Sequence, residues 1–91
     1  MAKPVPDWVL SAHAEREIAR RGIDKAIVAQ VLANPEQRLP VRPAREVLQS
    51  RMVRDGKTYL VRVFVDLDRD PPTVVTAYGT SKVGKYWSAT P

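Results

Sequence analysis

The chain has 91 residues, no cysteine and one histidine, and 15 Lys and Arg against 10 Asp and Glu give it a formal net charge of +5. This length suffices for one small domain, which we place at 8–91 behind a flexible N-terminus at 1–7. The lack of cysteine excludes a disulfide framework. The apolar runs are far shorter than the ~20 residues of a membrane span and we find no secretion signal, so we expect a cytoplasmic protein that does not contact membranes.

The first part of the chain predicts two short helices. Ser11 can cap the first helix, which places His13 in its first turn, and Gly22 can end it in the left-handed conformation. Asp24 can cap the second helix, whose apolar residues follow a period of 3.6. That helix should stop before Pro35, because the residue before a proline avoids the helical conformation.

Beyond these helices the apolar residues alternate with a period of two, which predicts β-strands. Four segments follow this pattern: 36–42, 45–54, 57–66 and 73–79. Asp55-Gly56, between the two longest segments, predicts a hairpin with a type I′ turn. We therefore expect an α+β fold in which two N-terminal helices pack on one face of a three- to four-stranded antiparallel sheet.

The positive charge is concentrated in one stretch of the chain. Residues 38–62 carry seven basic and two acidic side chains, whereas the segments before and after it are balanced. Ten of the 15 basic residues are Arg, whose forked guanidinium suits phosphate and carboxylate groups. We expect a polyanionic partner such as nucleic acid, with a solvated, charged sheet edge as the alternative.

The Asp55-Gly56 turn fixes the register of the hairpin and sorts its side chains into two faces. Leu48 and Val63 oppose each other on the face that should lie against the helices. A slip of one residue would exchange the two faces. On the other face, expected to be uncovered, the following polar side chains gather: Arg45, Gln49, Arg51 and Arg62 from the hairpin, with Thr76, Tyr78 and Thr80 from the last strand.

His13 is the only imidazole in the chain, and imidazole is the side chain best suited to proton transfer near neutral pH. Arg16 and Glu17 follow it at helical spacing, so Arg16 could bind a phosphate and Glu17 could orient the ring. A pair of Glu17 with Arg21 is the simpler interpretation. A hydrogen-bonded surface histidine without a chemical role is the alternative for His13.

The segment at 76–87 combines hydroxyl groups, lysines and aromatic rings. Lys82 and Lys85 could contact phosphates, and Tyr86 or Trp87 could stack on unpaired bases. Alternatively these rings cover the edge of the sheet, which we favour for Trp87. We expect no cofactor. We also expect no metal, because the acidic run before this segment lacks the glycine and the distal Glu of a calcium loop.

The chain resembles domain-of-unknown-function family 4258, a family of small bacterial proteins, in three segments around its basic hairpin: HAER at 13–16, RGI at 21–23 and VVTAYGTSKVGKY at 74–86. That family is grouped with the RelE, barnase, EndoU and colicin-type ribonuclease fold, and its members often look like toxins of toxin–antitoxin pairs. The resemblance implies metal-free RNA cleavage on the open sheet face. It carries over His13 and Arg16 from the first segment and these residues from the last: Thr76, Tyr78, Ser81, Lys82, Lys85 and Tyr86.

We therefore predict a metal-independent endoribonuclease, the toxin of a toxin–antitoxin system, in which attack by the ribose 2′-hydroxyl leaves a 2′,3′-cyclic phosphate. The expected catalytic side chains are His13 as base or acid, Tyr78 or Lys82 as the complementary group, and Arg16, Arg51 and Arg62 on the phosphate. The expected RNA-binding side chains are Arg45, Gln49, Arg62, Thr76, Ser81, Lys85 and Tyr86. The partners would be RNA and a protein antitoxin.

Two other functions would use the same basic face. A non-catalytic module would bind RNA or an acidic protein there without cleaving anything, and a toxin of another kind would act through contacts with a target protein.

Overall fold

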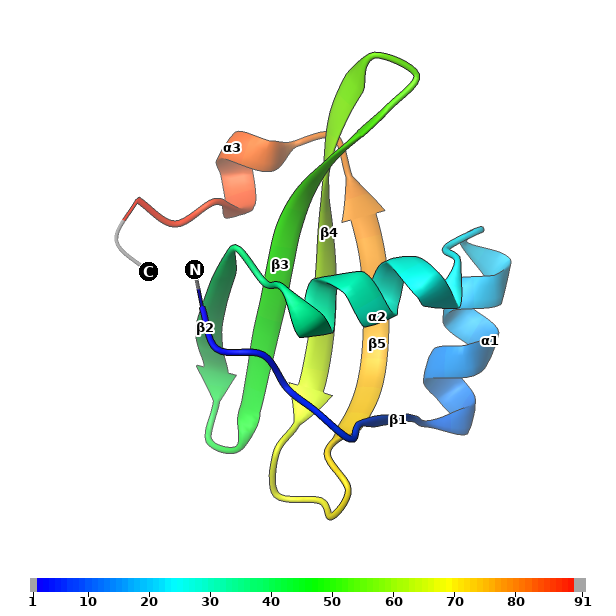
Figure 1. The fold of residues 1–91 in the computed structure, drawn as a ribbon, viewed down its shortest axis with the longest axis vertical. Coiled ribbons are helices and arrows are strands. Elements are labelled where there is room, and N and C mark those ends of the chain that lie inside the picture. Colours follow the sequence, from blue (N-terminus) through cyan, green and yellow to red (C-terminus); the bar gives the residue numbers. More distant parts are fainter. Residues whose placement is uncertain (1, 90–91) are drawn as a thin grey trace.

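A computed structural model of the protein describes residues 2–89 and shows a mixed five-stranded sheet with three helices (Figure 1). The elements are, in chain order, β1 (Val9–Leu10), α1 (Ala12–Arg20), α2 (Lys25–Ala33), β2 (Gln37–Arg42), β3 (Arg45–Arg54), β4 (Lys57–Asp66), β5 (Thr73–Thr80) and α3 (Val83–Tyr86). The strand order is β1-β5-β4-β3-β2, with β1 parallel to β5 and every other neighbouring pair antiparallel. The α+β class is confirmed.

The sheet has one strand more than we predicted, and this strand is parallel to its neighbour. β1 is only Val9 and Leu10, which is too short to show an alternating pattern in the sequence. Its position depends on hydrogen bonds to residues much later in the chain. The Val9 N–H donates to the Pro72 carbonyl at 2.9 Å, and the Ser11 N–H donates to the Val74 carbonyl at 3.0 Å. The four antiparallel strands of the prediction are present with nearly the predicted bounds.

The helix ends form as the local sequence predicts. The Ser11 hydroxyl accepts a hydrogen bond from the Ala14 N–H at 3.0 Å, and the Asp24 carboxylate accepts one from the Ala26 N–H at 2.9 Å. Gly22 adopts a φ of +68° after α1, a conformation that costs glycine nothing. The three predicted helix signals are confirmed.

The β3–β4 hairpin also follows its local signals and projects beyond the rest of the sheet (Figure 1). Asp55 and Gly56 both have positive φ values, 52° and 73°, as a type I′ turn requires. The predicted register is confirmed, so Leu48 and Val63 do oppose each other. We call the side of the sheet that bears Leu48 the first face and the opposite side the second face.

The main core lies between the first face and the two long helices. α2 crosses the sheet, and α1 runs beside β5 (Figure 1). The side chains that meet there are at most 1% exposed: Ile18, Val28, Leu32, Leu48, Val63 and Val65. Each such burial is worth about 1.5–3 kcal/mol. None of the helices between residues 2 and 89 is long and apolar enough to cross a membrane.

The N-terminal segment, which we predicted to be flexible, packs on this core in the structure. Val5 is 4% exposed, and its N–H donates to the Leu32 carbonyl at 3.0 Å. Trp8 lies against the same cluster of buried side chains. Residue 1 lies outside the described part of the chain.

The second face is partly covered, contrary to our prediction of an open face. Val47 and Leu60 point to this side, yet they are 1% and 0% exposed. On this side of the sheet α3 contacts β4, and the carbonyls of Tyr86 and Ser88 accept hydrogen bonds from Gln49 and Gln37. Apolar side chains in the middle of a sheet lose contact with water only when something packs on them, and here the chain's own C-terminal part does so.

Candidate functional site

A buried network of amide side chains attaches the C-terminal segment to the second face. The Gln49 amide nitrogen donates to the Gln37 side-chain oxygen at 2.7 Å and to the Tyr86 carbonyl at 3.1 Å. Gln37 in turn donates to the Ser88 carbonyl at 2.6 Å and accepts from the Ser88 N–H at 3.1 Å. Gln49 is completely buried, so these bonds fix α3 in one position on the sheet.

Arg62 lies at the end of this network and is held only by neutral groups. Its Nε donates to the Gln49 side-chain oxygen at 2.8 Å, and one terminal nitrogen donates to the Tyr78 hydroxyl at 2.7 Å. Its guanidinium carbon lies 4.4 Å from the ring centre of Tyr86 and 5.3 Å from that of Phe64. Among the ion pairs of residues 2–89, none involves Arg62.

Lys85 and Tyr86 complete a cationic and aromatic group that we call the Arg62 cluster: Arg62, Tyr78, Lys85 and Tyr86. The Tyr78 and Tyr86 rings meet edge to face, with centroids 6.2 Å apart. The Lys85 ammonium lies 5.3 Å from the Tyr86 ring centre. Contact with this ammonium and its positive charge lower the pKa of the Tyr86 phenol, and the Tyr78 hydroxyl and the Arg62 charge act in the same direction.

Two other arginines of the second face are neutralised by carboxylates. Arg45 forms two bonds to Asp66, at 2.6 and 3.0 Å, and this pairing lowers the pKa of the Asp66 carboxyl. Arg51 binds Glu36 with its guanidinium at 2.9 Å, and the ring of Trp87 lies 4.2 Å from the same guanidinium. Arg45 and Arg51 are therefore less available to a phosphate than Arg62 is.

His13 and Arg16 lie apart from the Arg62 cluster. α1 begins beside Val74, and Tyr78 is four residues further along β5, a distance of about 13 Å at ~3.3 Å per residue. The His13 side chain is 64% exposed, with its Nε2 atom 3.5 Å from a Glu17 carboxylate oxygen. Arg16 lies about 200° around the helix from the core residue Ile18 and faces solvent.

The remaining candidates lie along β5 and the link to α3. The Thr76 hydroxyl accepts a hydrogen bond from Arg21 at 3.2 Å, on the side of β5 nearest α1. Ser81 and Lys82 are exposed in the link between β5 and α3, where the Lys82 N–H donates to the Thr80 hydroxyl at 3.1 Å. The structure thus brings together one part of the predicted site, namely Gln49, Arg62, Tyr78, Lys85 and Tyr86.

The predicted pair of Glu17 with Arg21 is present at 3.6 Å, although Glu17 also contacts Arg20 and His13. Sequence reasoning missed Gln37, which supports the cluster. A usable signal existed, because Gln37 lies directly opposite Gln49 in adjacent strands. Two amides that face each other across adjacent strands can satisfy each other's donors and acceptors, which indicates a buried polar contact.

The fold and the site define a small α+β domain with a preorganised cationic and aromatic cluster on one face of its sheet. A family model described as Domain of unknown function (DUF4258) matches residues 10–79, and the chain belongs to this family. The matched region includes Arg62 and Tyr78 but ends before Lys85 and Tyr86. No curated protein and no solved structure matches the chain.

Proposed function

We propose that the protein is a metal-independent endoribonuclease that binds RNA at the Arg62 cluster. The observation that carries this proposal is that Gln49 and Tyr78 hold Arg62, while no carboxylate of residues 2–89 pairs with it. A guanidinium has five N–H donors, and the bonds to Gln49 and Tyr78 use two of them, which leaves three for phosphate oxygens. Because its partners and the surrounding rings already orient it, Arg62 can bind a phosphate with little reorganisation.

The chemistry follows from the groups around Arg62. The ribose 2′-oxygen forms a bond to phosphorus, and the bond from phosphorus to the 5′-oxygen breaks. Tyr86, as the phenolate favoured by Lys85, accepts the 2′-hydroxyl proton, and the Lys85 ammonium donates a proton to the departing 5′-oxygen. Arg62 stabilises the charge that develops on the phosphate oxygens, with Tyr78 as an additional donor.

RNA is the substrate that suits this arrangement best. The reaction needs a 2′-hydroxyl, which DNA lacks. The rings of Tyr86 and Trp87 are half-buried, and each has a guanidinium over one side, so an unpaired base would stack on the other side of the ring. Exposed Lys82 would contact a neighbouring phosphate. In this proposal His13 and Arg16 take no part in the chemical step.

The grouping of this family with the ribonuclease fold, and the toxin-like character of its members, support a biological role for such cleavage. As a toxin the protein would act on RNA in the cytoplasm, and its expression would stop bacterial growth. A protein antitoxin encoded beside it would restore growth.

Incubation of the purified protein with total RNA in EDTA tests the proposal. We expect cleavage with 2′,3′-cyclic phosphate ends. Lys85→Ala and Tyr86→Phe should each reduce the rate ~10²–10³-fold, which is typical of losing one contact to the transition state. Lys57→Ala, which removes an exposed cation at the hairpin tip, is the matched control and should retain activity. Unchanged cleavage by both cluster variants would exclude this site.

A non-catalytic RNA-binding module is the second candidate, and the pairing of Arg45 and Arg51 with carboxylates favours it. Because these two arginines are neutralised, few cations of the second face remain free. These few suffice for a weak RNA-binding site. RNA that binds with a salt-dependent affinity and stays intact would establish this function instead.

A further inference from the structure

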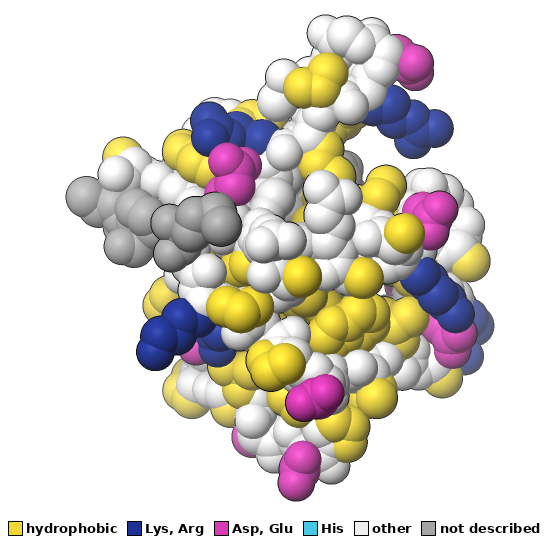
Figure 2. Space-filling model, viewed as in Figure 1, with side chains coloured by type: hydrophobic (Ala, Val, Ile, Leu, Met, Phe, Trp, Pro, Cys, Tyr) yellow, Lys and Arg dark blue, Asp and Glu magenta, His cyan; other side chains and the backbone are white. Residues whose placement is uncertain are grey.

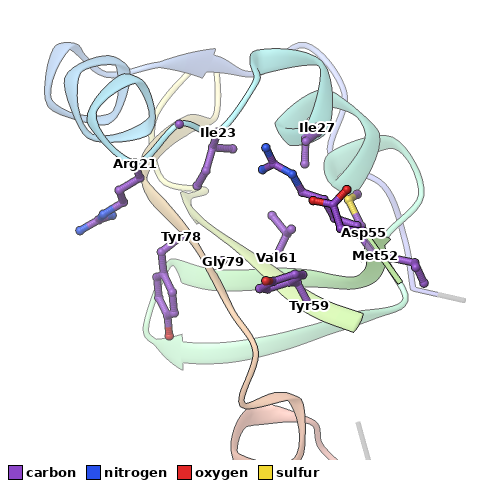
Figure 3. A pocket seen from close by; sticks show the side chains of 12 residues that line it. Arg21, Ile23, Ile27, Met52, Asp55, Tyr59, Val61, Tyr78 and Gly79 are labelled. Carbon is purple, nitrogen blue, oxygen red and sulfur yellow. The ribbon is translucent and has the colours of Figure 1, made fainter. Parts of the chain in front are cut away.

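A groove lies on the first face, and of the Arg62 cluster only Tyr78 is among its lining residues. It has a volume of about 790 Å³, within the range of ligand-binding clefts. The turn after α1, helix α2, the inner side of the projecting hairpin and the end of β5 surround it (Figure 3). Its lining is mainly apolar: Ile23, Ile27, Met52, Tyr59 and Val61.

One wall of this groove is a free strand edge. β1 pairs only with Thr73 and Val74, so within residues 2–89 no strand accompanies β5 on that side from 75 to 80. The Ala77 carbonyl points to this edge, but Ala77 is buried and its carbonyl already accepts a hydrogen bond from Arg21 at 2.8 Å, so the accessible part of the edge lies beyond Ala77. Backbone direction alternates along a strand, so the N–H and carbonyl of Gly79 point the same way.

Gly79 leaves the edge accessible from the groove. It is exposed, and a Cβ built on it would meet only the Leu60 carbonyl, at 4.0 Å. In Figure 3 Gly79 lies beside Val61, while the ring of Tyr78 points away from the groove. A free edge next to an apolar groove is the arrangement in which an extended peptide adds to a sheet with its side chains entering pockets.

The charges around the groove favour an acidic occupant. Arg21 and Arg54 lie on its rim with one acidic side chain, Asp55, and Arg21 is also paired with Glu17 at 3.6 Å, so Arg54 is the cation available to an occupant. In the part of the chain that the structure describes, Arg54 takes part in no ion pair. Figure 2 shows basic side chains beside the projecting hairpin. The net charge of +5 also opposes the approach of a second copy of the chain.

We propose that β5 and this groove bind an extended segment of a partner protein in which apolar residues alternate with acidic ones. The segment pairs with the free edge at Gly79. Its apolar side chains contact Ile27 and Met52, and its carboxylates lie near Arg54. This proposal does not depend on RNA cleavage at the second face.

The probe is a synthetic peptide in which valine alternates with aspartate, titrated into the ¹⁵N-labelled protein and followed by the amide NMR signals. We expect signals of Ile23, Ala77 and Gly79 to shift. A peptide of equal length in which lysine replaces aspartate should not bind, since Arg54 and the net positive charge repel it.

A pair of variants at one position tests the strand pairing. Gly79→Pro removes the N–H that would donate to the peptide, and proline is tolerated at a strand edge. We expect it to weaken binding at least about tenfold, whereas Gly79→Ala keeps the N–H and should bind as the parent does. The amide spectrum and thermal unfolding of each variant verify the fold.

A second pair tests the charge. Arg54→Glu should weaken binding of the acidic peptide more than Lys57→Glu, because Lys57 does not line the groove. Equal affinity of Gly79→Pro and Gly79→Ala would overturn the proposal, as would shifts confined to the signals near Tyr86. Concentration-dependent dimerisation through Gly79 would overturn it too, because a second copy would then occupy the edge.

Discussion

The hydrogen-bond network under α3 makes a strong prediction for Gln49→Leu. Leucine has nearly the volume of glutamine, so the substitution removes hydrogen bonds without opening a large cavity. Three bonds are lost: those to Gln37, to the Tyr86 carbonyl and from Arg62. Gln37 keeps its bonds to Ser88, but the Tyr86 carbonyl and the Arg62 Nε lose the partner that the structure gives them.

The cost of Gln49→Leu follows from these two groups. A buried polar group without a partner costs about 1–3 kcal/mol, and two partly buried groups should together cost about 2–4 kcal/mol in the free energy of unfolding. For a domain of this size each kcal/mol lowers Tm by about 4–8 °C. Urea unfolding followed by tryptophan fluorescence measures the change directly.

Gln30→Leu is the matched control, because Gln30 is exposed on α2 and should change stability by no more than about 0.5 kcal/mol. A loss below about 0.5 kcal/mol for Gln49→Leu would refute the view that this network holds α3 on the sheet. Gln49→Leu should lower the rate of RNA cleavage as well as the stability, since Tyr86 and Arg62 both lose a contact that orients them.

Three further predictions follow from individual contacts. Arg45 lowers the pKa of the Asp66 carboxyl, so this pair stabilises the fold above the unfolded pKa near 3.8, and the contribution is lost as the pH falls through the lower folded pKa. Between pH 7 and pH 2, Tm should therefore fall less in Arg45→Gln than in the parent. Equal falls in Tm would contradict this pairing. Gly56→Ala should lower the free energy of unfolding by about 1 kcal/mol, because φ is +73° at this position. An unchanged midpoint in chemical denaturation would argue against the type I′ turn. If Tyr86 is the base, the cleavage rate should rise with pH in both the parent and His13→Ala. A cleavage rate that does not change with pH in His13→Ala would instead indicate that His13 is the base.

The local features of this fold were predictable because each depends on residues close together in the chain. The Asp55-Gly56 turn determines the hairpin register through its two positive φ values, and the register determines which side chains share a face. The helix caps at Ser11 and Asp24 depend on side chains within three residues of their partners. The same register places Arg45 directly opposite Asp66.

Which arginines are free to bind a phosphate was not predictable in the same way. The guanidinium of Arg51 is paired with Glu36, which lies 15 residues earlier, and contacts the ring of Trp87. Arg62 keeps its charge because Gln49 and Tyr78, from the strands on either side, are neutral. Residue type alone does not separate these arginines, since the difference lies in which side chain each one meets across the sheet.

The sequence by itself determined the α+β class, the two helices and the hairpin register, because periodicity, caps and turns act over a few residues. Only the tertiary structure decided that α3 closes over the second face, that His13 lies far from Arg62, and that β5 keeps a free edge beside a groove. These features depend on contacts between residues distant in the chain, whose pairing is selected by burial and by the satisfaction of polar groups in the assembled fold.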